Sequence, residues 1–285
     1  MLDTARLREF EFTDADFNSL RRLVREVAGI SLADCKRELV YSRLARRLRH
    51  LGLTSFASYR EFLASEAGQA ELREFTNAVT TNLTAFFRER HHFDYLRDAL
   101  LVPRMADPLS SRRIRIWCSA VSTGEEAYSV AMTVAETVPD WRRWDIRILA
   151  TDLDTNVLAA AESGAYTLDR VRQLPRWQID RHFVRQGHGE GLRYVVKPEL
   201  QRMISFRQLN LTHPLPMRGP LDAIFCRNVI IYFDKETQRD LFQRMAPLQR
   251  PGDLLFLGHS ESLFKVSTAW TLIGKTVYRR NEEPC

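Results

Sequence analysis

The chain has 285 residues, of which 45% are hydrophobic and 27% are charged, and its formal net charge is +6. These proportions are those of soluble globular proteins, and the length is sufficient for two domains. No apolar run reaches the roughly 18 residues that a membrane span requires. The first residues also lack the apolar segment of a signal peptide, so we expect a cytoplasmic protein.

The cysteines and histidines are not arranged as metal ligands. The four cysteines are Cys35, Cys118, Cys226 and Cys285. They are widely separated and form no C-x-x-C pair, which argues against a disulfide framework or a zinc site. His91, His92 and His259 lack ligand spacing with cysteine or carboxylate partners, so we expect no metal. Cys118 and Cys226 are expected to be small buried residues at the ends of neighbouring strands.

The first part of the chain carries helical signals. Apolar residues recur at helical spacing after Thr13 or Asp14, either of which could cap a helix that ends at Gly29. Further helices are expected at about 33–51, where Gly52 stops the pattern, and at 58–66 and 71–82. We therefore predict an all-helical N-terminal module.

A basic patch lies on the second of these helices. It consists of Lys36, Arg37, Arg43, Arg46, Arg47 and Arg49, with Glu38 as the only acidic residue among them. The patch is either the solvated face of a helix or a docking surface for an acidic partner.

From about Arg112, strands and helices alternate. Strands are expected at 114–118, 145–151, 204–209, 222–227, 253–258 and 272–280, and helices at 125–138, 155–163 and 235–248. This order predicts an α/β domain with a parallel, doubly wound sheet. The segment 165–203 interrupts the alternation and is expected to be a small inserted β-rich unit.

Two strand ends carry the residues from which we predict a ligand site. The first strand runs through small residues and Gly124 into a helix, where Ser122 and Glu125 have capping-box spacing. The absence of G-x-G-x-x-G favours a cofactor without a pyrophosphate, although a merely structural turn is the alternative. The second strand ends at Asp152, which we expect to accept hydrogen bonds from a ribose, whereas Asp154 is expected to cap the next helix.

Several segments together resemble CheR-type chemoreceptor glutamate methyltransferases. They are residues 80–88 (TTNLTAFFR), 122–126 (STGEE), 150–152 (ATD), 225–234 (FCRNVIIYFD) and 258–261 (GHSE). The resemblance runs in order from about Phe12 to Arg280. It implies a helical N-terminal domain with its linker (1–90) and a Rossmann-like S-adenosylmethionine methyltransferase domain (91–285). A small antiparallel β-subdomain is inserted in the latter at about 165–203.

The resemblance also implies the site residues. The cofactor-binding residues carried over are Asn82, Thr84, Arg88, Glu126, Asp152, Asn210, Leu211, Arg227 and Asn228. Arg88 and Tyr232 are implied to be catalytic, and S-adenosylhomocysteine is the product. Because a glutamate with a pKa of about 4.3 is already ionised, its carboxylate needs no general base, and these two residues would orient it. The structural alternatives are an ion pair from Arg88 to Glu89 or Asp94, and a core-covering role for Tyr232.

The implied partner is the cytoplasmic helices of a chemoreceptor, which would meet the basic patch, and a receptor C-terminal peptide could pair with segment 165–203. One rival is a nucleic-acid methyltransferase that uses the patch on phosphates. Its Asn/Asp-Pro-Pro-Tyr motif is missing, since residues 228–232 contain no proline, and we expect no nucleic-acid partner and no membrane insertion. The other rival is a receptor-binding sensor without catalysis. A monomer is expected.

Overall fold

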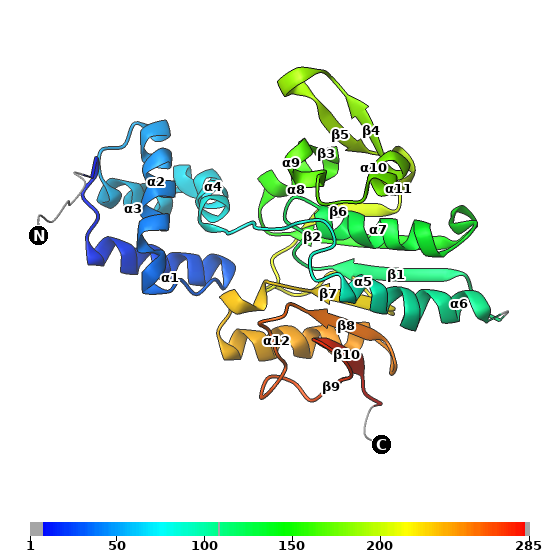
Figure 1. Ribbon diagram of the computed structural model, residues 1–285. Helices are drawn as coiled ribbons and strands as arrows, with labels where there is room; N and C mark the ends of the chain where they lie inside the picture. The colour runs from blue at the N-terminus through cyan, green and yellow to red at the C-terminus, as the bar shows by residue number, and fades with distance from the viewer. Residues whose placement is uncertain (1–7, 108, 283–285) are drawn as a thin grey trace, which may run out of the picture. The chain divides into compact units, whose positions relative to one another are not determined.

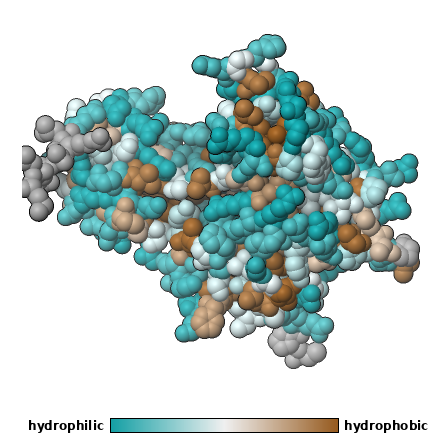
Figure 2. Space-filling model, viewed as in Figure 1, coloured by the Kyte–Doolittle hydropathy of each residue, from teal (hydrophilic) through white to brown (hydrophobic). Residues whose placement is uncertain are grey.

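The computed structural model describes residues 8–107 and 109–282, and these separate into two compact units (Figure 1). The first unit ends at Thr81 and also includes Tyr232–Asp234. The second begins at Asn82 and holds the rest of the chain. Among the described residues, no helix is long and apolar enough to span a membrane. Figure 2 shows a visible face that is mostly hydrophilic, with apolar residues in separate small groups.

The first unit consists of helices, as predicted. They are α1 (Asp14–Ala28), α2 (Arg37–Leu51), α3 (Phe56–Ala64) and α4 (Gln69–Val79). Thr13 begins α1 in a capping box with Asp16, and Gly29 and Gly52 end α1 and α2 in the left-handed conformation. The predicted bounds were wrong in three places, the first being α3, which was expected at 58–66 and runs from Phe56 to Ala64. Residues 34–36 form a separate 3-10 turn before α2, and α4 stops at Val79, so the chain is already extended at Thr80.

Aromatic residues and one buried ion pair hold this unit together. The ring centroids of Phe12 and Phe56 lie 4.4 Å apart. Glu71 on α4 is only 5% exposed, and its carboxylate accepts hydrogen bonds from the Arg47 guanidinium at 2.6 and 2.9 Å and from the Tyr59 hydroxyl at 2.8 Å. Because the charge of Glu71 is paired and fully hydrogen-bonded, its burial between helices is tolerated.

The second unit is built on a seven-stranded sheet in the order β6-β2-β1-β7-β8-β10-β9. The strands are β1 (Arg113–Cys118), β2 (Asp145–Asp152), β6 (Ile204–Gln208), β7 (Ala223–Cys226), β8 (Leu254–Leu257), β9 (Trp270–Leu272) and β10 (Val277–Arg280). The pairs among β6, β2, β1, β7 and β8 are parallel. The main helices are α5 (His91–Leu96), α6 (Val102–Ala106), α7 (Glu125–Thr137), α8 (Thr155–Ser163) and α12 (Lys235–Met245). The Rossmann-like α/β prediction is confirmed.

Two predictions for this unit were wrong. The terminal strand expected at 272–280 is instead an antiparallel hairpin, in which Tyr278 pairs with Leu272. Thr276 in the connecting turn has a φ of 54°, a conformation that no continuous strand contains. The helical stretch from His91 to Ala106, which includes a π-helical turn at Arg97–Leu101, was not predicted at all.

The inserted segment contains a small antiparallel sheet, as predicted. Its strands are β3 (Ala165–Tyr166), β5 (Arg193–Val196) and β4 (Phe183–Gln186), in that order across the sheet. Three short helices accompany them: α9 (Leu168–Val171), α10 (Arg176–His182) and α11 (Pro198–Gln201). The segment is thus mixed in composition and not purely β.

Candidate active site

The strand order reverses between β1 and β7. The chain passes from β1 to β2 and β6 on one side and then crosses to β7 and β8 on the other. In open α/β sheets, the crevice beyond the carboxyl ends of the strands at such a reversal is where ligands bind. Cys118 ends β1 and Cys226 ends β7, and both thiols are buried, as predicted. Burial also raises the pKa of both thiols, so neither is a reactive thiolate.

The turn from β1 into α7 depends on Gly124 and not on a capping box. The predicted Ser122–Glu125 capping box is wrong, because Gly124 is the N-cap residue and no side chain caps the helix. Gly124 has a φ of 95°, and a Cβ there would lie 2.8 Å from the Cβ of Ala161 on α8. The buried Glu125 carboxylate is bound by Thr123 Oγ1 at 2.7 Å and by the Arg170 guanidinium of α9. A glycine is therefore required for this close helix packing.

Asp152 fixes the loops around the ends of β1 and β2. One carboxylate oxygen accepts from the Ser122 backbone N–H at 2.7 Å and the other from the Asp154 backbone N–H at 3.0 Å. Burial raises the pKa of Asp152 to about 6, although these two N–H groups act in the opposite direction. Asp154 caps α8, as predicted, and its other oxygen accepts from the Asn82 side-chain amide at 2.8 Å. Each Asp152 oxygen keeps a lone pair for a ligand hydroxyl.

Arg227, directly after β7, lies between two carboxylates. Its guanidinium is 2.9 Å from Glu126 Oε2 and 3.3 Å from Glu89 Oε2, and it also donates to the backbone carbonyl of Arg88. Burial raises the pKa of Glu126 to about 7 even though Arg227 counteracts it. For Glu89, burial is outweighed by the hydrogen bond from His259 and the charge of Arg227, so its pKa falls to about 2.

Three buried polar atoms of this cluster, Glu126 Oε1, Glu89 Oε2 and Arg227 Nε, have no hydrogen-bond partner among the described residues. A buried carboxylate oxygen without a donor is costly, and a bound donor group would satisfy it. Hydroxyl and ammonium groups, which an amino-acid nucleoside carries, are donors that the carboxylates of Glu126 and Asp152 could accept from.

Arg88 lies in a strained turn. Phe87 and Glu89 on either side of it have φ values of 51° and 58°. Its guanidinium donates to the Leu83 carbonyl at 3.0 Å and, within the described chain, forms no ion pair with Glu89 or Asp94. The structural alternative for Arg88 is therefore wrong. Backbone strain of this kind persists only where surrounding contacts hold it, here from Arg227 and from Ser129, whose hydroxyl accepts from Phe87 N at 2.9 Å.

The loop after β7 is held by Glu261, to which the sequence reasoning gave no role. Its buried carboxylate accepts hydrogen bonds from the backbone N–H groups of Asn228, Val229, Ile230, Ile231 and Gly258, at 2.6–3.3 Å. Asn228 is held in a left-handed conformation with a φ of 57°. A Cβ at Gly258 would lie 2.4 Å from the Asn228 side-chain amide. The only sequence signal was the position of Glu261 at the end of the 258–261 motif.

The other predicted residues are placed as follows. The Asn210 carboxamide accepts from Thr212 N at 3.0 Å in a turn after β6, and Leu211 is buried beside it. Thr84 is half-buried in the segment before Arg88. Tyr232 belongs to the first unit, where its carbonyl accepts from Ser31 N at 2.7 Å.

Three side chains near this site could hold a metal ion. Ligand atoms of Glu89, His91 and His92 lie within 4.8 Å of one another, so the expectation that the histidines lack a carboxylate partner was wrong. The Arg227 guanidinium already compensates the charge of Glu89 at 3.3 Å. Burial and the nearby Arg227 charge also lower the pKa of His92 to about 3, which leaves it neutral.

The fold and this strand edge define a Rossmann-like methyltransferase. Residues 82–279 match the family model described as "CheR methyltransferase, SAM binding domain", and residues 15–80 match "CheR methyltransferase, all-alpha domain". The chain is 48% identical to Chemotaxis protein methyltransferase 2 of Pseudomonas aeruginosa, over 95% of both chains. It is 45% identical to Chemotaxis protein methyltransferase of Escherichia coli, over 95% of this chain and 92% of the relative. The chain belongs to the CheR methyltransferase family.

Proposed function

We propose that this protein transfers a methyl group from S-adenosylmethionine to glutamate side-chain carboxylates of chemoreceptors. The products are glutamate methyl esters and S-adenosylhomocysteine. The observation that carries the proposal is the unsatisfied buried oxygen of Glu126, in the first turn of α7 after the strand reversal, in a chain that belongs to this family. The names of the curated relatives supply the chemotactic context.

Within this proposal, Asp152 accepts hydrogen bonds from the ribose and Glu126 binds near the methionine or ribose end. Asn210 and Leu211 lie against the adenine, and Arg227 acts on the cofactor by holding Glu126 in place. Asn82, Thr84, Arg88 and Asn228 complete the binding set. When bound, the cofactor supplies a methyl group on a positively charged sulfur, which a carboxylate oxygen can take up directly.

The acceptor carboxylate requires orientation and not deprotonation, because it is already ionised at neutral pH. We propose that Arg88 binds this carboxylate through its guanidinium and that Tyr232 donates one hydrogen bond to it. Arg88 suits this role because its guanidinium has no competing carboxylate partner in the described chain. No residue acts as a general base and no metal takes part.

The remaining proposals concern organisation and partners. Residues 1–90 would form the helical domain with its linker, and residues 91–285 would carry out the transfer in the cytoplasm as a monomer. Receptor helices would meet the basic patch, and segment 165–203 could accept a receptor C-terminal peptide along its sheet edge. Nucleic acid is not a substrate in this proposal.

The test uses methyl-labelled S-adenosylmethionine with receptor cytoplasmic fragments, and the readout is base-labile methanol. We expect Arg88→Ala to reduce ester formation at least about 100-fold while the affinity for S-adenosylhomocysteine falls less, because Arg88 contacts the acceptor as well as the cofactor in this proposal. Arg90→Ala, at an exposed arginine two residues away, is the matched control. Tight cofactor binding by the wild-type protein without any labile ester would show that the proposed acceptor is wrong.

A further inference from the structure

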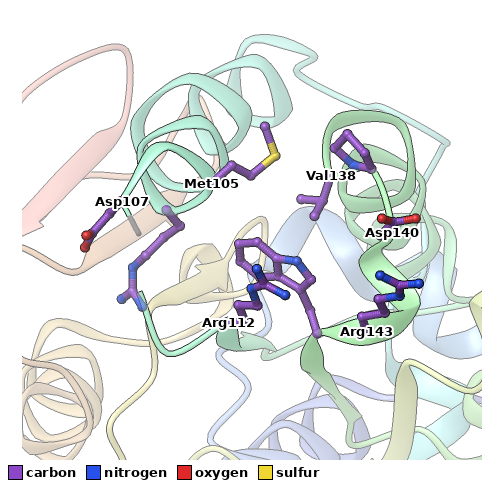
Figure 3. A pocket seen from close by; sticks show the side chains of 9 residues that line it. Met105, Asp107, Arg112, Val138, Asp140 and Arg143 are labelled. Carbon is purple, nitrogen blue, oxygen red and sulfur yellow. The ribbon is translucent and has the colours of Figure 1, made fainter. Parts of the chain in front are cut away.

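A cavity lies at the opposite edge of the sheet from the candidate active site. It has a volume of about 380 Å³, and the residues that line it include Met105, Arg112, Val138, Asp140, Arg143 and Trp144 (Figure 3). Arg112 immediately precedes β1, and Trp144 immediately precedes β2, so the cavity is at the amino ends of these strands. The carboxyl ends of the same strands carry the residues assigned above to S-adenosylmethionine. This volume is within the range of small-ligand sites.

Two arginines of this cavity have no side-chain partner among residues 8–107 and 109–282. Neither the Arg112 nor the Arg143 guanidinium forms a hydrogen bond or an ion pair with any described residue. By contrast, two nearby arginines are paired: Arg104 donates to Asp222 at 2.6 Å, and Arg142 lies 2.8 Å from Glu199. Two unpaired guanidiniums beside one cavity match a phosphate monoester, which carries nearly two negative charges at neutral pH.

The backbone around these arginines is strained. Arg112 has a φ of 51°, which arginine rarely adopts, and Asp140 has a φ of 49°, which aspartate tolerates better. The two residues belong to different segments, one before β1 and the other in the turn before β2. Strain held on both sides of a cavity is typical of functional sites.

The rest of the cavity suits a planar ring with polar edges. Met105 and the Trp144 indole provide apolar surface against which a ring can stack, and Val138 lies behind them in the core. Asp107 accepts from the Leu109 backbone N–H at 2.9 Å, and in Figure 3 its carboxylate is turned away from Arg143. Asp140 remains as an acceptor for a hydroxyl or ring N–H. The combination of two phosphate-binding arginines, an indole and a carboxylate is suited to a nucleotide.

We propose that this cavity binds a nucleoside monophosphate, with the phosphate between Arg112 and Arg143 and the base against Trp144. The site is separate from the one that holds S-adenosylmethionine, and its occupation does not depend on the methyl acceptor. The protein would therefore bind a second small molecule in addition to S-adenosylmethionine.

The test measures the binding of guanosine 5′-monophosphate to the full chain by calorimetry, with the active site saturated by S-adenosylhomocysteine. We expect one bound nucleotide per chain, and we expect Arg112→Gln and Arg143→Gln each to weaken binding at least about tenfold. Arg147→Gln, at an exposed arginine of β2 that does not line the cavity, should leave the affinity unchanged within about twofold. Guanosine and inorganic phosphate alone should each bind much more weakly.

Three outcomes would overturn the proposal: no binding of the nucleotide, equal binding by the two cavity variants, or equal loss in Arg147→Gln. Binding of inorganic phosphate as tight as that of the nucleotide would also overturn it, because the ring would then contribute nothing. Unchanged affinity of every variant for S-adenosylhomocysteine serves as the check that each is folded.

Discussion

Glu126 and Glu89 share one guanidinium, yet their pKa values are displaced in opposite directions. Glu126 is more deeply buried, and its carboxylate receives a hydrogen bond from Arg227 alone, so desolvation dominates and its pKa rises to about 7. Glu89 has a second partner in His259 at 3.0 Å, and its pKa falls to about 2. At neutral pH, Glu89 is therefore ionised and balances the charge of Arg227. Glu126 has a pKa close to neutral pH, so a bound ligand can change its protonation.

Cofactor affinity should consequently depend on pH through Glu126. A raised pKa keeps this acid protonated below about 7, and only the ionised form offers both oxygens to a donor. Between pH 6.5 and 8.5 the ionised fraction rises about fourfold, so we expect the affinity for S-adenosylhomocysteine in calorimetry to rise by about that factor. Glu126→Gln should bind more weakly and lack this step. A wild-type affinity that is flat over this range would contradict the assignment of Glu126 to the cofactor.

At the scale of elements, buried carboxylates hold both loops that follow the central strands. Asp152, at the end of β2, accepts from the backbone of the β1–α7 turn, and Glu261 accepts from five backbone N–H groups, four of them in the loop after β7. Each carboxylate is remote in sequence from the loop that it organises. The loops themselves include left-handed residues, Ser122 and Asn228, which local preference alone would not maintain.

Glu261→Gln should disorder the loop after β7. A glutamine amide presents an NH₂ group where the carboxylate oxygen accepts, so several backbone donors lose their partner at a cost of about 3 kcal/mol. We expect faster hydrogen exchange at Asn228–Ile231 and a lower free energy of unfolding in urea. Ser260→Ala, at an exposed neighbour without a side-chain hydrogen bond in the described chain, is the control. Unchanged exchange at these amides would show that the loop is held by other contacts.

Across the whole molecule, sequence patterns located the elements wherever both ends carried a local signal. Helix α8 has the predicted bounds because Asp154 caps it and Gly164 ends it. The hairpin β9–β10 was mistaken for one strand because its turn at Thr276 has no glycine in the left-handed position. The stretch 91–106 lacks a cap at either end, and its helical structure depends on packing against the sheet.

The candidate site was predictable only in part, because some of its contacts join residues that are distant in the sequence. Asp152 and Glu126 could be found because they follow strands or begin a helix, and such positions have a general meaning in α/β folds. The pairing of Arg227 with Glu89 spans 138 positions of the chain, and that of Glu261 with Asn228 spans 33. Such partners are chosen by the tertiary fold, so no local pattern indicates them.

The structure shows that most basic side chains of the patch on α2 have partners within the first unit. Arg37 pairs with Asp14, Arg47 with Glu71 and Arg49 with Glu9, and Arg43 donates to the carbonyls of Ala78 and Thr80. Most of these charges are thus used within the first unit. Among the six basic residues, Arg46 is exposed and its side chain has no hydrogen bond or ion pair with a described residue.

Arg46 and Arg47 therefore allow a matched test of receptor docking. If the patch binds acidic receptor helices, Arg46→Gln should raise the KM for receptor fragments about three- to fivefold, with a weaker salt dependence and unchanged kcat. Arg47→Gln should instead lower the free energy of unfolding by about 3 kcal/mol, because it leaves the buried Glu71 without its cation. Methylation kinetics at two salt concentrations, together with urea unfolding of both variants, separate the two effects. If KM is insensitive to Arg46, the receptor is recognised through a surface other than this patch, and the charges of α2 serve only to hold the helical unit together.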